Sequence, residues 1–424
     1  MVTNKYQRVI ADQQIEVFEF DLQKFCTRTE EALFDLESPL AQIVIGVRRC
    51  GKSTLCHKVL LQNKIGYAYV NFDDERLASL KTEQLDDVLE AIYIVYGDFK
   101  YLFLDEIQNV KEWSLFVNRL LRQNLHLIIT GSNAKLLSSE LSTYLTGRYN
   151  QIELFPFSFS EYLELRGIKS NVQTTKDIAF RKQAFEDFLT KGGFPELFNV
   201  KDSKGYVKRL VNNIIAVDIK KRFKIRYIDT LIKITNYLIA NFAQEINYKG
   251  LADNFSLGSQ HTALNYVNYL RQTYILVGIN KFSFKARERI RSEKMYLIDQ
   301  SLVTEQDNNL TTENIGWRLE NIVFLELLRR KKSDDYDVYY YRNGYEIDFV
   351  VCKKHQPLEL IQVSMRIDTD KTFKRETSSL VKGSKAMKCT KLTLLTLGEN
   401  EIHNINGAII NEVNIIDWLL QNLR

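Results

Sequence analysis

Short apolar runs alternate with segments of helical spacing through the first 160 residues of the chain. The runs lie at residues 41–45, 66–72, 101–104, 125–130 and 151–154. Each run has the length and composition of a buried strand, and the segments between them, such as 84–96, have the spacing of helices. Because strands and helices alternate, the pattern predicts a domain of the α/β class.

The pattern on either side of these strands is mainly helical. Residues 1–40 form a predicted helical lead-in, and residues 161–228 form a predicted helical lid or linker with a Gly192-Gly193 turn. The apolar anchors expected in the lead-in are Phe18, Phe20, Leu22, Phe25, Leu33, Phe34 and Leu36. We therefore place the first domain at residues 1–160 and the lid or linker at 161–228.

Residues 229–300 carry a different pattern. Three helical segments are followed by two β segments, at 275–282 and 294–298, and Ser259 caps the third helix,. Three helices and a β-ribbon resemble a winged helix, whose third helix would enter a major groove of DNA. The sequence therefore predicts a winged-helix-like domain at this position.

The last predicted domain covers residues 301–424. It opens with a helix from Gly316 to Leu328, and an Asn343-Gly344 pair predicts a tight turn between its first two strands,. The predicted strands lie at 338–342, 346–351 and 360–364. The pattern here predicts a small α/β domain.

Length and composition are those of an ordinary folded protein. The chain has 424 residues, of which 45% are hydrophobic and 26% are charged, and this length suits roughly two to four domains. It contains four prolines and no Gly/Ser-rich linker, so we expect the domains to follow one another through helices. A net charge of +5 permits a nucleic-acid partner without requiring one.

Neither a signal core nor a membrane-spanning run is visible in the apolar pattern. The cysteines are Cys26, Cys50, Cys56, Cys352 and Cys389. Their spacing is neither that of a disulfide framework nor that of a metal site, which suits a reducing compartment. We therefore expect a soluble, cytoplasmic protein without a membrane partner.

The strand at 41–45 runs into a loop whose residues fit a triphosphate. The loop and the start of the next helix read Gly46-Val47-Arg48-Arg49-Cys50-Gly51-Lys52-Ser53-Thr54. Gly46 and Gly51 permit backbone angles that turn successive N–H groups toward phosphate oxygens. Lys52 would bind the β- and γ-phosphates, and the Ser53 hydroxyl would complete the shell of a Mg²⁺ ion. The positive end of the helix would face the same anion.

Three side chains inside this loop have simpler expected roles. Arg48 and Arg49 are expected to enrich the positive charge of the site, without a separate function. Cys50 is either a filler residue or a thiol that makes the loop oxidisable.

A second strand supplies the acidic half of the predicted site. Residues 101–104 are apolar and run directly into Asp105 and Glu106. A buried strand would bring Asp105 to the phosphate side of the sheet, where its carboxylate can hold the Mg²⁺ shell. Glu106 is placed to orient and deprotonate a water that attacks a γ-phosphate.

Further candidates follow the later strands. Ser132 and Asn133 come directly after the strand at 125–130, so one of them can sense the γ-phosphate or hold the attacking water, and we assign the sensing role to Asn133. Arg148 is a candidate for stabilising the charge of a transition state, either in its own subunit or in a neighbouring one. The alternative for Arg148 is an ion pair with a structural carboxylate.

The order of these motifs resembles that of the AAA-type P-loop ATPases of bacteria and archaea. The resemblance rests on Gly46–Ser53, Asp105-Glu106, Thr130-Gly131-Ser132-Asn133 and Thr146-Gly147-Arg148 through Phe155-Pro156-Phe157-Ser158-Phe159-Ser160-Glu161-Tyr162. It implies a P-loop NTPase fold, with a parallel five-stranded sheet, helices on both faces, and an extra strand between those that carry Lys52 and Asp105. It also implies ATP as the nucleotide and leaves open whether the protein forms a homo-oligomer.

More narrowly, the chain is similar to members of this family whose C-terminal domain is related to the PD-(D/E)xK nucleases. In that pattern acids hold a metal ion, and a lysine two residues after an acid on the third strand steadies the attacked phosphate. Glu320 and Asp348 fit the first two acidic places, but Gln362 and Ser364 stand where the last acid and the lysine belong. Glu359 would point to the opposite face of a regular strand. We therefore expect a nuclease-like domain that has lost its chemistry.

Basic residues gather at the predicted wing. They are Lys281, Lys285, Arg287, Arg289, Arg291 and Lys294. At this place they would contact the phosphates of double-stranded DNA. The alternative is a solvated loop on a unit that only spaces the outer domains.

These features lead to two main hypotheses. The first is an Mg²⁺-dependent ATPase that couples hydrolysis to movement of the winged-helix and C-terminal domains on DNA. The second is a slow ATP-dependent switch whose C-terminal domain docks another protein. A third, an active DNA nuclease, requires the chemistry that Gln362 and Ser364 lack.

Overall fold

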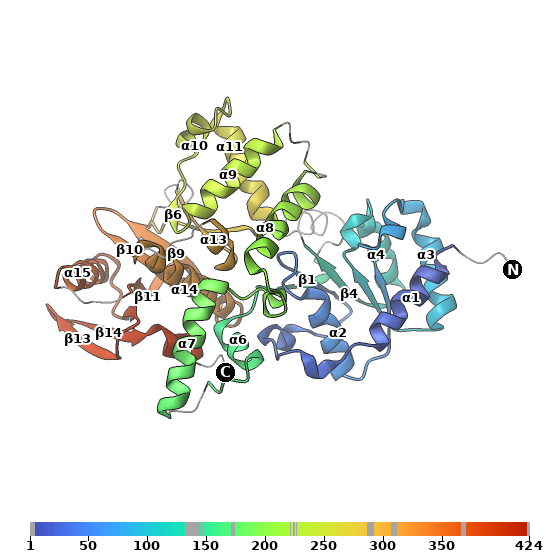
Figure 1. Cartoon of the computed structure of the whole chain (residues 1–424), viewed down its shortest axis with the longest axis horizontal. Coiled ribbons are helices and arrows are strands. Elements are labelled where there is room, and N and C mark those ends of the chain that lie inside the picture. Colours follow the sequence, from blue (N-terminus) through green and yellow to red (C-terminus); the bar gives the residue numbers. More distant parts are fainter. Residues whose placement is uncertain are drawn as a thin grey trace. The chain divides into compact units, whose positions relative to one another are not determined.

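The computed structural model describes residues 5–132, 145, 147–170, 174–220, 222–223, 225, 227–285, 292–306, 312–365 and 370–421 (Figure 1). The chain divides into two compact units. The first comprises residues 1–156 with 272–274, and the second comprises residues 157–271 with 275–424. Within the described residues, no helix combines the length and the apolar character that crossing a membrane requires.

The first unit is built on a parallel sheet. Its strands are β1 (Ala41–Ile45), β2 (Tyr67–Asn71), β3 (Tyr101–Asp105), β4 (His126–Gly131) and β5 (Tyr149–Glu153). Their order is β2-β3-β4-β1-β5, and all four neighbouring pairs are parallel. β4 therefore lies between the strand that leads to Lys52 and the strand that ends in Asp105, which confirms the predicted P-loop NTPase fold.

Helices cover both faces of this sheet. α2 (Lys52–Gln62) lies on one face, and α3 (Leu85–Tyr96) and α4 (Trp113–Arg122) lie on the other (Figure 1). This distribution follows from right-handed crossovers, because the connection from β1 to β2 runs in one direction along the sheet and those from β2 to β3 and from β3 to β4 run in the other,. The prediction of helices on both faces is thus confirmed.

The N-terminal lead-in is only partly helical. α1 (Gln7–Phe18) packs against α3 and β2, and it buries Val9, Ile10 and the amide of Gln13. The chain then continues through short 3₁₀ turns at Leu22–Lys24 and Thr29–Leu33. The prediction of an apolar anchor is wrong for Phe18, Phe25 and Leu33, because these residues are 78%, 37% and 36% exposed. The apolar residues of the lead-in do not share one helix, so they do not form one buried stripe.

His57 lies inside an aromatic cluster on α2. Its ring contacts the rings of Phe20, Tyr67, Tyr69 and Phe103. Its Nδ1 lies 2.7 Å from the hydroxyl of Tyr67. Burial lowers the pKa of His57 to about 4, from an ordinary value of 6.5, so the imidazole stays neutral until the solution is strongly acidic.

Acid should therefore destabilise the first unit through His57. Between pH 6.5 and pH 4 the unfolded chain binds a proton at this position that the folded chain does not, so stability falls as pH falls. Between pH 7 and pH 4.5 we expect this residue to lower the free energy of unfolding by about 2–3 kcal/mol. Urea denaturation at both pH values checks this, because His57→Phe should lose that part of the pH dependence. An unchanged dependence in the variant would contradict the assignment.

The second unit begins with helices. They are α6 (Phe159–Leu165), α7 (Thr175–Lys191), α8 (Ser203–Asn213), a π-helical segment at Ile214–Ile219, α9 (Ile228–Ala240), α10 (Tyr248–Asn254) and α11 (Gln260–Gln272). The predicted Gly192-Gly193 turn packs closely against Phe157. The Phe157 amide donates to the Gly193 carbonyl at 2.8 Å, and a Cβ on Gly193 would collide with the Phe157 carbonyl. Glycine is therefore required at this position.

A small antiparallel sheet accompanies helices α9 to α11. It consists of β6 (Gln244–Glu245), β7 (Leu276–Asn280) and β8 (Glu293–Leu297), in the order β6-β8-β7. β8 is the central strand and pairs with both neighbours. Side chains on β8 are therefore more buried than those of a free ribbon, which matters for Lys294 below.

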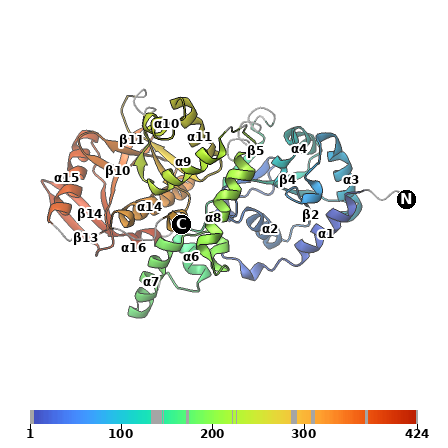
Figure 2. The ribbon, with the colours of Figure 1, turned by 45° about the horizontal axis from the view of Figure 1, so that its top comes forward.

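The C-terminal part of the second unit contains a mixed sheet. Its strands are β9 (Asp337–Arg342), β10 (Glu346–Lys353), β11 (Gln356–Val363), β12 (Leu392–Thr396), β13 (Glu401–Ile405) and β14 (Ala408–Asn414). Their order is β13-β14-β12-β11-β10-β9. Helices α13 (Ser301–Gln306), α14 (Thr312–Asp334), α15 (Asp370–Met387) and α16 (Ile415–Leu420) accompany it. α15 packs on β10, β11, β12 and β14 (Figure 2), and the predicted small α/β domain is confirmed.

Candidate functional site

The loop between β1 and α2 has the backbone geometry that its glycines permit. Gly51 adopts φ 96° directly before α2, a value that favours glycine. A Cβ on Gly46 would collide with the carbonyl oxygen of Leu154. Both glycines of the predicted phosphate-binding loop are therefore required by the fold itself.

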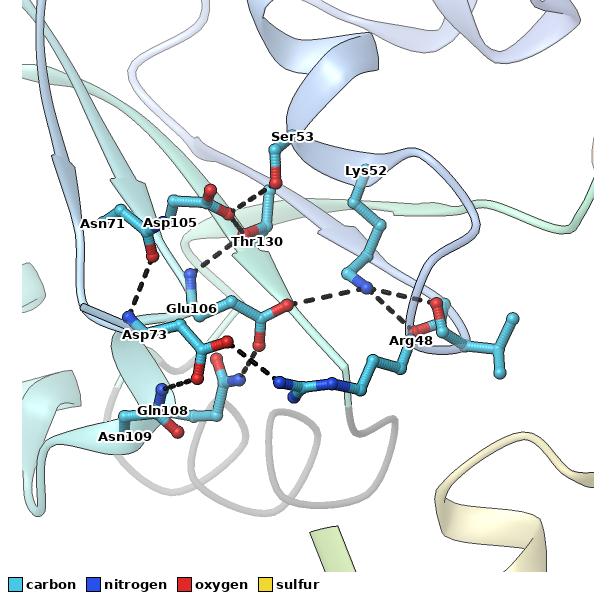
Figure 3. Close-up of polar contacts among 12 residues, drawn as sticks. Arg48, Lys52, Ser53, Asn71, Asp73, Asp105, Glu106, Gln108, Asn109 and Thr130 are labelled. Carbon is cyan, nitrogen blue, oxygen red and sulfur yellow. Dashed lines mark hydrogen bonds and ion pairs between the residues drawn. The ribbon is translucent and has the colours of Figure 1, made fainter. Parts of the chain in front are cut away.

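Lys52 points back into this loop (Figure 3). Its Nζ donates to the carbonyl oxygens of Gly46, at 3.3 Å, and Val47, at 3.2 Å. The same atom lies 3.6 Å from Oε1 of Glu106, and the Lys52 side chain is 4% exposed. The ammonium group is thus largely removed from water and held beside the acid that directly follows β3,.

Hydroxyl groups surround the carboxylate of Asp105. The Ser53 hydroxyl donates to Oδ1 at 2.9 Å, and the Tyr69 hydroxyl donates to Oδ2 at 3.1 Å. The Thr130 hydroxyl also donates to Oδ1. Burial, together with the charge of Glu106, raises the pKa of Asp105 to about 6, although the hydrogen bonds from Thr130 and Ser53 oppose the change. A cation beside Asp105 would favour its ionised form again.

Glu106 has an unusual backbone conformation. Its φ is 53°, in the left-handed region that residues other than glycine seldom adopt,. Its amide donates to the Thr130 hydroxyl at 3.0 Å. The side chain accepts a hydrogen bond from Gln108 and pairs with Lys52. Strained backbone of this kind is common at functional sites, and here it turns the acid toward the phosphate-binding loop.

Several neighbours of the site were not predicted from the sequence. Tyr69 and Thr130 contact Asp105 from β2 and β4, and no local pattern specifies these contacts because they depend on strand register. Arg48 was expected to have no separate role, but its Nη2 lies 2.9 Å from Oδ2 of Asp73. Arg48 therefore fixes the end of β2 to the loop (Figure 3).

Cys50 is fully buried in the loop, and burial raises the pKa of its thiol. Because the thiolate is the reactive species, this environment disfavours oxidation. The interpretation of Cys50 as a filler residue is therefore favoured.

Ser132 and Asn133 are the predicted candidates that follow β4. Ser132 is buried at the end of β4, and within the described part of the chain its hydroxyl has no hydrogen-bond partner. Asn133 lies outside the described residues. Ser132 leaves one polar atom available to a ligand at this edge of the sheet.

Arg148 lies at the wrong edge of the sheet to act in its own subunit. Its carbonyl accepts the amide of Ala41 at the start of β1, whereas the phosphate-binding loop follows the end of β1. β1 has five residues, so roughly 15 Å separate the two edges at about 3.3 Å per residue. The role of Arg148 in a neighbouring subunit stays a prediction.

The residues that the C-terminal pattern singled out lie around one cavity of about 860 Å³. Glu320, Asp348, Gln362 and Ser364 all line it. Asp348 is held in place by the Val363 amide, which donates to its Oδ2 at 2.8 Å. Burial first, and then the charge of Glu320, raise the pKa of Asp348 well above its usual range.

Glu359 lies apart from this cavity, as expected from strand alternation. It accepts a hydrogen bond from Thr393 and pairs with Lys391 at 2.8 Å. It lines a different cavity, together with Arg330 and Trp418. Glu359 therefore does not supply the missing acid.

The predicted basic run at the wing is not one surface. Arg287, Arg289 and Arg291 lie outside the described residues, and Lys281 and Lys285 flank that segment. The prediction that Lys294 lies on the wing and contacts DNA phosphates is wrong. Its side chain is 5% exposed, and its Nζ lies 2.6 Å from Oε1 of Glu320. As a member of the central strand β8, Lys294 faces the C-terminal cavity instead of solvent.

Comparison with known proteins divides the chain into three parts. Residues 38–163 match the AAA domain family. Residues 182–313 match a domain of unknown function, DUF8612, and residues 316–415 match another, DUF4143. The AAA match contains the phosphate-binding loop and the acids of β3.

Two uncharacterized proteins resemble most of the chain. One, from Methanocaldococcus jannaschii, is 33% identical over 374 residues, which are 85% of this chain and 82% of that protein. The other, from Haemophilus influenzae, is 27% identical over 400 residues, which are 91% of this chain and 95% of that protein. Both similarities extend well beyond the AAA match.

Solved structures show weaker similarity. RuvB, a Holliday junction branch migration motor from Thermotoga maritima, is 19% identical, with 56% of this chain and 81% of that chain covered and a TM-score of 0.28. AMPPCP-bound DnaA from Aquifex aeolicus is 14% identical, with 60% and 91% covered and a TM-score of 0.27. The strand order β2-β3-β4-β1-β5 is what shows the P-loop NTPase fold.

Proposed function

This chain belongs to the same family as the uncharacterized Methanocaldococcus jannaschii protein and contains an AAA domain, and from this premise we propose that it binds and hydrolyses ATP with Mg²⁺. The observation that carries the proposal is the 2.9 Å hydrogen bond from Ser53 to Asp105. It joins the phosphate-binding loop to the acid of β3, which are the two halves of a magnesium-nucleotide site.

The residues present fit this cofactor. The Ser132 hydroxyl has no partner among the described residues and is free to bind a ligand, and a cation would compensate the charge of the buried Asp105 carboxylate. Residues 46–54 would hold the phosphates, and Ser53 with Asp105 would hold the Mg²⁺, which neutralises charge on the phosphates. Lys52 would bind a phosphate, and Glu106 would orient and deprotonate the attacking water.

We further propose that hydrolysis drives movement of the second unit on double-stranded DNA. The order of α9, β6, α10, α11, β7 and β8 supports a winged helix, in which α11 would be the third helix. Polar side chains on α11 that lie at the surface, such as Gln260 and Asn265, are of the type that reads base edges,. The proposed parts are a lid at 161–228, a winged helix at 229–300 and a nuclease-like domain at 301–424.

A second candidate function is an ATP-dependent switch that docks another protein. Ile402 and Ile409 expose 72% and 56% of their side chains. They lie on the same face of the β13–β14 hairpin at the edge of the C-terminal sheet. Exposed apolar side chains at a sheet edge favour contact with a protein partner.

ATP turnover by the full chain, with and without Mg²⁺ and duplex DNA, separates these functions. The first proposal expects turnover that requires Mg²⁺ and rises with DNA, whereas a docking switch would hydrolyse slowly and ignore DNA. Size-exclusion chromatography with nucleotide should accompany the assay, because a neighbouring subunit is where Arg148 would act. Absence of Mg²⁺-dependent turnover and of ATP binding would refute both functions.

A further inference from the structure

Two carboxylates of the second unit pair with one lysine, and a third lines the same cavity. Glu320 comes from α14, Glu346 and Asp348 come from β10, and Lys294 comes from β8. Lys294 Nζ lies 2.6 Å from Oε1 of Glu320 and 2.9 Å from Oε1 of Glu346. The pairing of β10 with β9 is irregular between Ile347 and Val350. Asp348 lies within this irregularity, in the same cavity,.

Gln362 adds a further oxygen to this group. It lies on β11, lines the same cavity and is 6% exposed. Its Oε1 has no hydrogen-bond partner among the residues that the structure describes. Carboxylates and an amide carbonyl are the oxygen ligands that hard divalent cations bind, so this wall of the cavity has the donor set of a metal site.

A divalent ion nevertheless does not fit beside Lys294. Metal–oxygen distances are about 2.0–2.6 Å, and the ammonium nitrogen already stands 2.6 Å from Oε1 of Glu320. An ion bound to that oxygen on the cavity side would overlap the ammonium group or be repelled by its charge. These oxygen atoms therefore do not bind a divalent ion while the Lys294 ammonium group is present.

We propose that Lys294 is the resident cation of this cluster and takes the place of a divalent metal ion, so that removing its charge opens a metal site formed by Glu320, Glu346, Asp348 and Gln362. The C-terminal domain then has two reasons not to bind a metal ion. Gln362 and Ser364 replace the acid and the lysine of the nuclease pattern, and Lys294 occupies the place of the ion. Lys294 also connects β8 to α14 and β10 through its ion pairs with Glu320 and Glu346. Removing Lys294 would leave these carboxylates without a counter-charge, which destabilises the fold.

The test is the thermal unfolding of the full chain without nucleotide, in EDTA and in MnCl₂. The Tm of the wild-type second unit should be the same in both solutions. Lys294→Met should lower the Tm in EDTA, because the carboxylates then repel one another. Saturating Mn²⁺ should raise the Tm of this variant by about 5–10 °C.

A double variant locates the new site. Lys294→Met combined with Asp348→Asn keeps the phosphate-binding loop intact and should lose the Mn²⁺ response. Terbium luminescence gives an independent readout, because the Tyr296 hydroxyl lies 2.6 Å from Oε1 of Glu320 and its ring can sensitise a bound ion. The single variant should show more of this emission than the wild type and the double variant, in which the ion can bind only beside Asp105 and Tyr69.

Two results would overturn the proposal. One is a Lys294→Met protein whose Tm does not respond to Mn²⁺. The other is a wild-type Mn²⁺ response that Asp348→Asn removes. If Lys294→Met fails to fold, wild type and Glu346→Gln decide the question. A resident lysine predicts no Mn²⁺ response in either, and a native metal predicts a response in wild type that Glu346→Gln weakens.

Discussion

Replacing Glu106 by glutamine is expected to lower ATP turnover by about 10²- to 10⁴-fold, the range that a general base supplies, while ATP binding persists. Glutamine has nearly the same shape as glutamate but does not accept a proton from water at neutral pH. Its amide also does not pair with Lys52 as the carboxylate does at 3.6 Å. In this variant no carboxylate competes with a phosphate for Lys52, so ATP should bind at least as tightly as to the wild type.

Steady-state turnover and equilibrium binding of a fluorescent ATP analogue test this expectation separately. Glu112→Gln is the matched control, because Glu112 is an exposed acid in the same segment after β3. It makes the same chemical change six positions away and should leave both quantities unaltered. Unchanged hydrolysis in Glu106→Gln would remove Glu106 from its proposed role.

Replacing Lys52 by alanine should weaken ATP binding by about 10²- to 10⁴-fold. Lys52 would donate to two phosphates, and each hydrogen bond to a charged group contributes about 1.5–3 kcal/mol, where 1.4 kcal/mol corresponds to a tenfold change. The side chain now lies against the carbonyls of Gly46 and Val47, so truncation also loosens the loop that would receive the phosphates.

Isothermal titration with ATP and Mg²⁺ measures this loss. Lys100→Ala is its control, since Lys100 is exposed and precedes β3, at the opposite end of that strand from Asp105. The control removes the same charge and should bind ATP normally. Thermal unfolding of both variants shows whether the first unit remains folded. Normal ATP affinity in a folded Lys52→Ala protein would refute the proposed site.

The sequence predicts the first unit well because its signals are local. A buried strand, a loop with two glycines and a helix follow one another within residues 41–62, so their geometry depends on few distant contacts. The same holds for the acids that end β3. The contacts of Tyr69 and Thr130 with Asp105 were missed because they depend on the order and register of neighbouring strands.

Distant contacts also explain the errors. Lys294 belongs to a run of basic residues, which by itself predicts an exposed surface. Its partners Glu320 and Glu346 lie 26 and 52 positions further along the chain, and no local pattern reports that pairing. The prediction that Phe18 is a buried anchor failed for a related reason. Its exposure depends on where the chain turns after α1 and not on its own hydrophobicity.

The pairing of Lys52 with Glu106 has a consequence for the order of events during a catalytic cycle. One ammonium group does not neutralise a carboxylate and a phosphate equally well at the same time. An arriving triphosphate would exchange one anion for another at Lys52, and the displaced carboxylate would then regain its affinity for protons. Binding of the triphosphate would thus release Glu106 from Lys52 and make it available as the base.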